Sequence, residues 1–317
     1  MLEIFFCNVG DGDAALITET QDGKPVYAML VDAGRPYLEP KQGSLRKEAI
    51  YYLKARGIEH LDRMVLTHLH IDHIGGAQRI LEAIQTDRLS VLTLPPKDAE
   101  WITPDPLSVD KPTNGLCYAL NILRDLVQRA ARVGCTVEEI PEGKQRLTDR
   151  LLLTVYHPRM KVIGQQRAVF DELYRQKSVP YEDVYRVSKA RNLSSLMLRL
   201  TYAGKSVLIT GDRYAADWED AGLPPCDILK LPHHGDPKSM TEKLLKSLHP
   251  GYAVISCQND QNQKKDRPNA EIIELLQAYV PKVLCTENRE MPTMPAATNN
   301  GVRFTISDDG EIACSVE

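Results

Sequence analysis

The sequence lacks long apolar runs and a strong net charge of either sign. Its 317 residues carry 39 Lys and Arg against 43 Asp and Glu, a net charge of −4. The overall charge therefore does not indicate a nucleic-acid-binding protein, and only a local basic patch could serve that purpose. No stretch has the length and apolarity of a membrane span, and no basic leader precedes the first strand, so we expect no membrane association.

Paired cysteines are also missing. The chain has seven cysteines, an odd number, and none has the close spacing of a zinc ribbon or a disulfide framework. They are Cys7, Cys117, Cys135, Cys226, Cys257, Cys285 and Cys314. We therefore expect buried, reduced thiols in a cytoplasmic protein.

Hydrophobic residues make up 43% of the chain, which is enough to bury a substantial core. A chain of this length could form two average domains, but large sandwich folds often run as one. Apolar patterns and turn residues predict strands and helices in alternation. The strands are expected over 2–8, 14–18, 26–31, 63–67, 89–94, 151–156, 195–202, 206–210, 228–231, 253–256, 282–285, 302–306 and 311–315. The helices are expected over 44–56, with Ser44 as N-cap, and over 74–85, 115–132, 170–175, 240–248 and 269–280.

The most informative stretch follows the apolar run 64–66. Residues 67–76 read Thr-His-Leu-His-Ile-Asp-His-Ile-Gly-Gly, so three imidazoles and one carboxylate fall within six positions. Neutral imidazole and carboxylate are good ligands for zinc and other first-row divalent metals. The cluster precedes an amphipathic pattern, which places it on a strand-to-helix loop, where functional sites are often built.

Alternation of side chains suggests how this stretch is arranged. In an extended segment, His68, His70 and Asp72 lie on one side. His73 is then expected to turn toward a second centre.

These residues resemble a known family. The pattern His-x-His-x-Asp-His is the signature of the metallo-β-lactamase superfamily, and residues 67–76 fit it at every ligand position. Four further segments resemble motifs of that superfamily in order and spacing, namely 4–17, 30–34, 208–212 and 227–235. The first and last of them are similar to the ComEC/Rec2 competence-protein branch. Asn8 and Asp11 depart from that branch's opening pattern, whereas Val9, Gly10, Gly12 and Asp13 keep it.

The resemblance implies a fold and a metal centre. The fold is the α/β (α+β) four-layer αββα metallo-β-lactamase sandwich, with two divalent ions at one edge where the sheets meet. We expect one domain, 1–317, with inserts at about 95–143 and 159–191. The implied ligands are His68 and His70 on the first ion, Asp72, His73 and His234 on the second, and Asp212 as the bridge. Asp32 resembles the early Asp that orients the metal loop.

One ligand of the related enzymes is missing. Many relatives place a His before the strand that leads to the bridging Asp, where this chain has Asn192. Three roles are open for Asn192: a weak metal ligand, a contact to a substrate phosphate, or a turn cap. His233 is another candidate for the vacant position. Zinc is the first expectation for the two ions, and manganese is the alternative because it accepts oxygen ligands.

Two metal ions can activate a water for attack on phosphoesters, thioesters or lactams. The incomplete first site favours phosphoesters because it leaves room for a phosphoryl oxygen. Lys230 could neutralise an anionic substrate, or it could be a strand lysine held in a salt bridge. The candidate catalytic residues are Asp72, Lys230, His233 and Asn192.

The insert 159–191 mixes basic and aromatic residues, as single-stranded nucleic acid or a nucleotide would require. Its acidic residues allow a second interpretation, a solvated helical lid. The segment 262–269 lies where the ComEC branch often carries His-Pro, and its His is absent here.

We predict a cytoplasmic metal-dependent hydrolase that cleaves a phosphodiester or phosphomonoester with a metal-activated water. Its partner would be an anionic substrate, a phosphoester or a nucleic acid or nucleotide. Two alternatives remain open: a carboxyl-type hydrolase such as a lactonase or thioesterase, and a non-catalytic metal-binding sensor module.

Overall fold

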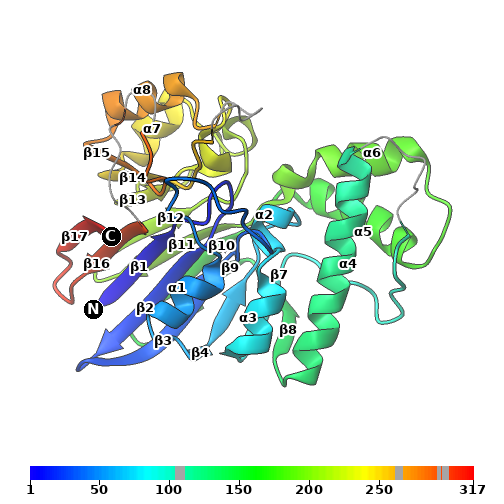
Figure 1. The fold of residues 1–317 in the computed structure, drawn as a ribbon. Helices are drawn as coiled ribbons and strands as arrows, with labels where there is room; N and C mark the ends of the chain where they lie inside the picture. Colours follow the sequence, from blue (N-terminus) through cyan, green and yellow to red (C-terminus); the bar gives the residue numbers. More distant parts are fainter. Residues whose placement is uncertain (104–110, 261–266, 291–293, 295–299) are drawn as a thin grey trace.

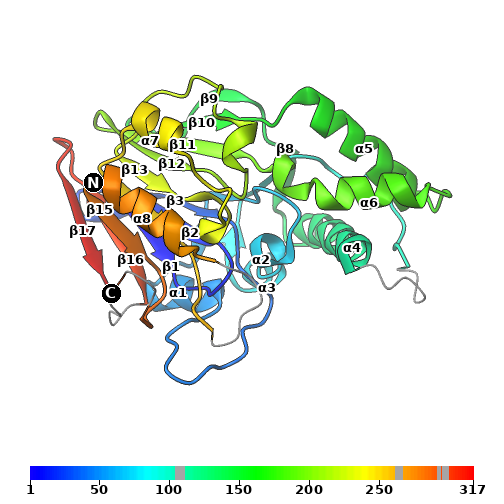
Figure 2. The ribbon, with the colours of Figure 1, turned by 90° about the horizontal axis from the view of Figure 1, so that it is seen from above.

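Two mixed β-sheets lie face to face, and helices cover the outer face of each (Figures 1 and 2). The computed structural model describes residues 1–103, 111–260, 267–290, 294 and 300–317. Part of the first insert, 104–110, and part of the segment 262–269, namely 262–266, lie outside the described residues.

The first sheet has eight strands and is antiparallel on one side and parallel on the other. In spatial order they are β17 (Ile312–Val316), β16 (Gly301–Ile306), β1 (Leu2–Cys7), β2 (Ala15–Gln21), β3 (Lys24–Val31), β5 (Arg63–Val65), β7 (Arg88–Val91) and β8 (Thr136–Glu139). Pairing is antiparallel from β17 to β3 and parallel from β3 to β8. A separate parallel pair joins β4 (His60–Leu61) to β6 (Gln85–Thr86).

The second sheet has seven strands. In spatial order they are β15 (Lys282–Cys285), β14 (Tyr252–Ile255), β13 (Ile228–Lys230), β12 (Lys205–Ile209), β11 (Met197–Tyr202), β10 (Leu152–Tyr156) and β9 (Gly143–Arg146). Strands β12 to β15 are parallel, and β9 to β12 are antiparallel.

Alternation along the strands supplies both faces of the first sheet, as β1 shows. Ile4 and Phe6 enter the core between the sheets, whereas Phe5 and Cys7 enter the core beneath the outer helices. Successive side chains of a strand point to opposite faces, so an unbroken apolar run of this kind fits a strand buried on both sides. Each large side chain buried in this way contributes about 1.5–3 kcal/mol.

Helices complete the outer layers. Those that pack on the first sheet are α1 (Ala49–Ala55), α3 (Ala77–Ala83) and α4 (Lys111–Arg132), and those on the second are α7 (Glu242–Leu248) and α8 (Ala270–Tyr279). The order helix, sheet, sheet, helix confirms the predicted αββα sandwich.

The segments predicted as inserts contain three helices that pack together, and one of them, α4, also covers the first sheet. Helix α4 comes from the first insert, and α5 (Met160–Tyr174) and α6 (Tyr181–Lys189) come from the second. The three share a small apolar core, and the Tyr174 hydroxyl donates to the Leu120 carbonyl at 2.6 Å. They form the green and teal helices to one side of the sheets in Figure 1.

The helix expected over 44–56 begins later, at Ala49, and Ser44 does not cap it. Arg46 instead reaches across the fold, where its guanidinium donates to Gln258 at 2.8 Å and to Asp260 at 3.1 Å. The Lys47 backbone N–H donates to the Asn8 carbonyl. Tertiary contacts therefore hold these residues outside the helix. None of the described helices combines the length and the apolar character needed to cross a lipid bilayer.

Candidate metal centre

Strand ends from both sheets bring the predicted ligands to one edge of the sandwich. His68 lies three residues after β5, and Asp212 lies three residues after β12. His234 follows β13 in the short turn η3 (Pro232–Gly235). Because parallel strands end at the same edge of a sheet, side chains far apart in the sequence meet here.

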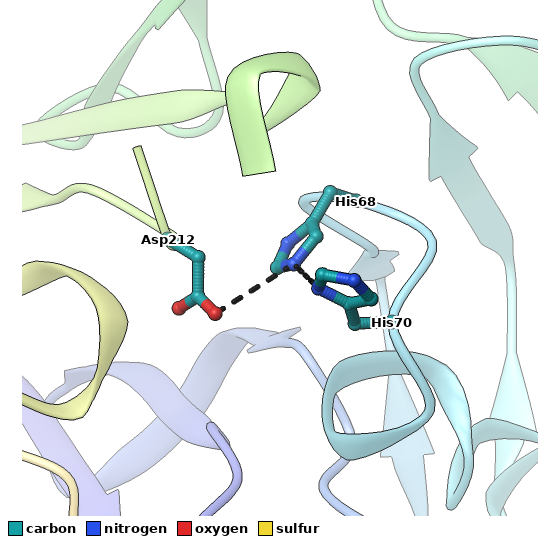
Figure 3. Close-up of side chains that lie close together, drawn as sticks. All are labelled: His68, His70 and Asp212. Carbon is teal, nitrogen blue, oxygen red and sulfur yellow. Dashed lines mark hydrogen bonds and ion pairs between the residues drawn. The ribbon is translucent and has the colours of Figure 1, made fainter. Parts of the chain in front are cut away.

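The first ligand group consists of His68, His70 and Asp212, whose ligand atoms all lie within 4.8 Å of one another. Nε2 of His68 is 2.9 Å from Nδ1 of His70 and 3.8 Å from Oδ2 of Asp212. Figure 3 shows the His68 imidazole between the His70 imidazole and the Asp212 carboxylate, with dashed lines to both.

The second ligand group consists of Asp72, His73 and His234. Asp72 and His73 lie on the short helix α2 (Ile71–Ile74), so the strand alternation expected for Asp72 does not apply. Nε2 of His234 is 3.7 Å from Oδ2 of Asp72. Oδ2 of Asp212 is 3.3 Å from Nε2 of His73 and 3.6 Å from Nε2 of His234, so Asp212 contacts both groups.

Three buried atoms of this cluster have no hydrogen-bond partner among the described residues. They are Nε2 of His73, Nε2 of His234 and Oδ1 of Asp212. Leaving a buried polar atom unpaired costs about 1–3 kcal/mol. Imidazole and carboxylate are also the ligands that divalent transition metals prefer. The cluster therefore fits two divalent ions.

Burial sets the charge of the first pair of imidazoles. It lowers the pKa of His68 well below its usual value, and burial together with the Arg191 charge lowers the pKa of His70 to about 3. Both rings are therefore neutral at physiological pH, the form in which imidazole binds metal.

Around His73 the carboxylates outweigh burial. Burial opposes its charged form, but Asp212 and Asp32 raise the pKa of His73 well above its usual value. Burial by itself would raise the pKa of Asp212. The charges of His73 and His234 nevertheless hold the pKa of this carboxyl well below its usual value.

Asp32 links the metal loop to one of the ligands. Its carboxylate accepts hydrogen bonds from the backbone N–H and the hydroxyl of Thr67, both at 2.8 Å, and lies 2.8 Å from Nδ1 of His73. A carboxylate on the far nitrogen fixes the orientation of a ligating imidazole.

Asp13 is a residue of the site that the sequence did not single out. Its oxygens lie 3.8 Å from Nδ1 of His73 and 3.7 Å from Nδ1 of His234. Its carboxylate also accepts from the Lys230 ammonium, and both side chains are buried. The sequence left two roles open for Lys230, a contact to an anionic substrate and a salt bridge. Its position corresponds to the salt bridge, which lies behind the centre. The only sequence signal was the match of Asp13 to the branch's opening pattern.

Asn192 and His233 lie side by side next to Asp212. Nδ2 of Asn192 is 3.1 Å from Nε2 of His233, which is 3.8 Å from Oδ2 of Asp212. Oδ1 of Asn192 has no partner among the described residues. His233 and His234 both have left-handed backbone angles, φ 52° and 57°, which cost about 1–3 kcal/mol each and occur where surroundings enforce them.

Comparison with known proteins gives a consistent picture. The family description "Metallo-beta-lactamase superfamily" matches residues 9–100. ComE operon protein 3 of Bacillus subtilis is 26% identical over 302 residues, which are 90% of this chain and 32% of that protein. Recombination protein 2 of Haemophilus influenzae is 26% identical over 275 residues, 86% of this chain and 26% of that protein. The chain thus spans a third or less of either relative.

Two solved structures resemble the chain at low identity. The metallo-beta-lactamase fold protein YhfI from Bacillus subtilis is 12% identical, with 90% of this chain and 97% of that chain covered and a TM-score of 0.47. An isothiocyanate hydrolase from Delia radicum gut bacteria is 13% identical, with 100% of both chains covered and a TM-score of 0.46.

The ligand motif, the family match and the two curated relatives agree in the residues they concern. Together they show that residues 9–100 match the metallo-beta-lactamase superfamily and that the chain is similar in sequence to ComE operon protein 3 and Recombination protein 2.

Proposed function

We propose that this protein is a phosphodiesterase-like hydrolase of an anionic phosphoester. The observation that carries the proposal is that two largely buried ligand groups meet at one carboxylate, Asp212, and that imidazole and carboxylate atoms of these groups have no hydrogen-bond partner among the described residues. Two divalent ions, when bound, would supply an activated water and positive charge for the attacking and leaving oxygens.

The chain's own residues divide this work. His68 and His70 would hold the first ion, Asp72, His73 and His234 the second, and Asp212 both. Asp32 would keep the His73 imidazole in its binding orientation. Zinc suits the imidazole-rich donor set best, and manganese is the alternative.

Asn192 and His233 are the proposed contacts for the substrate. Both polar side chains are buried, and His233 lies within 3.8 Å of Asp212. An amide or imidazole N–H at this position can donate to a phosphoryl oxygen that becomes more negative in the transition state. Lys230 is not part of this set, because its ammonium is bound to Asp13.

Two observations favour phosphoesters over carboxyl esters. One relative is named a recombination protein, and recombination is a process of nucleic acids. Helix α6 also presents a stacked pair of tyrosines, Tyr181 and Tyr185, with the Lys189 ammonium 5.6 Å from the Tyr185 ring. Such a surface suits bases and phosphates. The cytoplasm is the proposed location, because the seven cysteines are all free thiols.

The test is a hydrolysis screen with added Zn²⁺ or Mn²⁺. The substrates are bis(p-nitrophenyl) phosphate, p-nitrophenyl phosphate, a single-stranded oligonucleotide, a lactam, a lactone and a thioester. His70→Ala serves as the blank, and His60→Ala serves as the matched control because His60 is an exposed imidazole paired with Asp87.

We expect turnover of a phosphoester by the wild type and by His60→Ala, and none by His70→Ala. Turnover of the thioester or lactone alone would instead support a carboxyl-type hydrolase. Tight metal binding without turnover of any substrate would support a sensor module.

A further inference from the structure

Two arginine–carboxylate pairs lie against the candidate metal centre. In the first, Arg35 donates from Nε to Oδ1 of Asp11 at 2.5 Å and from Nη2 to Oδ2 at 2.7 Å. The same Nη2 is 3.9 Å from Oδ2 of Asp72, a candidate ligand. About a third of the Arg35 side chain, 34%, is exposed to solvent.

The position of this first pair follows from the glycine beside it. A Cβ on Gly12 would lie 2.5 Å from the Asp72 carbonyl oxygen, so only glycine lets the turn pack against the metal loop. Asp11 is the preceding residue, and this close packing brings it and Arg35 to the side of Asp72.

The second pair lies beside His233. Arg267 donates from Nε and Nη2 to Oδ2 of Asp236, at 3.0 and 2.9 Å. Its Nη2 is also 3.4 Å from Nδ1 of His233. Arg267 belongs to the segment in which the His of the ComEC pattern is absent.

A row of close contacts runs through the centre from one arginine to the other. Asp72 to His234 is 3.7 Å, His234 to Asp212 is 3.6 Å, and Asp212 to His233 is 3.8 Å. Arg35 contacts the first member of this row, and Arg267 contacts the last. The first and the last member of this row therefore each contact a guanidinium that is also paired with a carboxylate.

Guanidinium groups suit phosphate recognition at such positions. A guanidinium has five N–H donors and keeps its charge at any physiological pH, so one group can bind a carboxylate and a phosphate together. The partner carboxylates also hold each guanidinium in place, so less side-chain entropy is lost when a phosphate binds. A substrate with a single phosphate needs only the metal centre. A chain of phosphates could also reach the arginines at its ends.

We propose that Arg35 and Arg267 bind the phosphates that flank the scissile one, so that the preferred substrate is a single-stranded oligonucleotide and not an isolated phosphodiester. This inference rests on the proposed phosphoesterase function and adds its specificity-determining residues.

The test compares two substrates in three variants, Arg35→Ala, Arg267→Ala and Arg88→Ala. Bis(p-nitrophenyl) phosphate has no flanking phosphate, and a single-stranded oligonucleotide has many. Arg88→Ala is the matched control, since Arg88 is a half-exposed arginine paired with Glu138 at the start of β7, at the strand end away from the centre.

We expect Arg35→Ala and Arg267→Ala each to raise the KM for the oligonucleotide about tenfold. Each should also reduce the salt dependence of log kcat/KM by about one unit of slope, because one phosphate contact is lost. The kcat/KM for bis(p-nitrophenyl) phosphate should fall by a smaller factor than that for the oligonucleotide, because this substrate has no flanking phosphate, and Arg88→Ala should match the wild type on both substrates.

Metal content and melting temperature show that each variant is folded and loaded. Arg35→Lys and Arg267→Lys keep the positive charge but lose the two-donor geometry of the guanidinium, so they should retain part of the oligonucleotide affinity. Equal losses on both substrates, or no loss on either, would overturn the inference while phosphoesterase activity stands. A wild type that turns over neither substrate would instead refute the proposed function itself.

Discussion

The ammonium of Lys230 and the carboxylate of Asp13 form a buried ion pair directly behind the candidate metal centre. The pair joins the end of β13 to the turn after β1, two segments that belong to opposite sheets. Oδ1 of Asp13 is 3.7 Å from Nδ1 of His234, so the ion pair lies against a candidate metal ligand.

Replacing Lys230 by Met should destabilise the protein by about 3–5 kcal/mol, because it leaves the Asp13 carboxylate buried without its partner. Urea unfolding measures the change. The double variant Lys230→Met/Asp13→Asn should recover much of the loss. Lys243→Met is the control, since Lys243 forms an exposed pair with Asp220 and should contribute about 0–1 kcal/mol. A loss for Lys230→Met as small as that of the control would contradict the prediction.

Asp212→Ala should lose both metal ions, because its carboxylate contacts both ligand groups. His70→Ala should lose mainly the ion of the first group, and His60→Ala should keep both. Elemental analysis after gel filtration measures metal per chain. One tightly held ion remaining in Asp212→Ala would count against a shared centre and in favour of a sensor site.

Asp32→Asn should weaken metal binding about 10–100-fold, because the amide cannot accept from both Thr67 and the His73 imidazole as the carboxylate does. Competition with a chromophoric chelator measures the affinity. Asp62→Asn is the matched control, since Asp62 accepts from the Ala28 backbone N–H at 2.7 Å outside the centre. Equal affinities in the two variants would show that Asp32 does not orient a ligand.

Removal of metal by a chelator should lower the melting temperature, and Zn²⁺ or Mn²⁺ should restore it. The physical reason is that the unpaired buried atoms of His73, His234 and Asp212 gain a partner only when an ion is bound to the folded chain. Differential scanning calorimetry with and without chelator measures the shift. The same melting temperature in both states would mean that this cluster holds no stabilising ion.

Thiol reactivity should separate Cys314 from the other cysteines. Burial raises the pKa of Cys7 and of Cys226 to about 12, so these thiols stay protonated and unreactive throughout the neutral range. Cys314 is partly exposed, whereas the other six are buried. An aromatic disulfide reagent at pH 8 should therefore titrate one thiol per folded chain and seven in denaturant. Rapid reaction of several thiols in the folded protein would disprove this.

Local patterns predicted much of the fold because they depend on neighbours in the sequence. The apolar alternation of β1 and the turn residues after it define a strand without reference to the rest of the chain. The start of α1 was predicted wrongly, because Arg46 is held by Gln258 and Asp260, more than 200 positions away. No local pattern contains such a contact.

For the candidate site, too, the residues within one local motif could be predicted, whereas contacts between distant residues could not. The candidate ligands His68, His70, Asp72 and His73 could be predicted from the sequence, because imidazoles and carboxylates rarely gather so densely after a buried strand unless they bind a metal. The pairing of Lys230 with Asp13 was not readable, because a buried lysine on a strand is equally consistent with several partners. The contacts of Arg35 and Arg267 could not be predicted either, because an arginine in the sequence is likewise consistent with several partners.

By itself the sequence determined the chemistry of the donors and the sandwich that carries them, because residue type, order and short-range periodicity are written along the chain. Only the tertiary structure decided that Asp212 contacts both ligand groups, that Lys230 is bound to Asp13 and that Arg35 and Arg267 lie against Asp72 and His233. These are distances between side chains of different strand ends, and the packing of two sheets sets them.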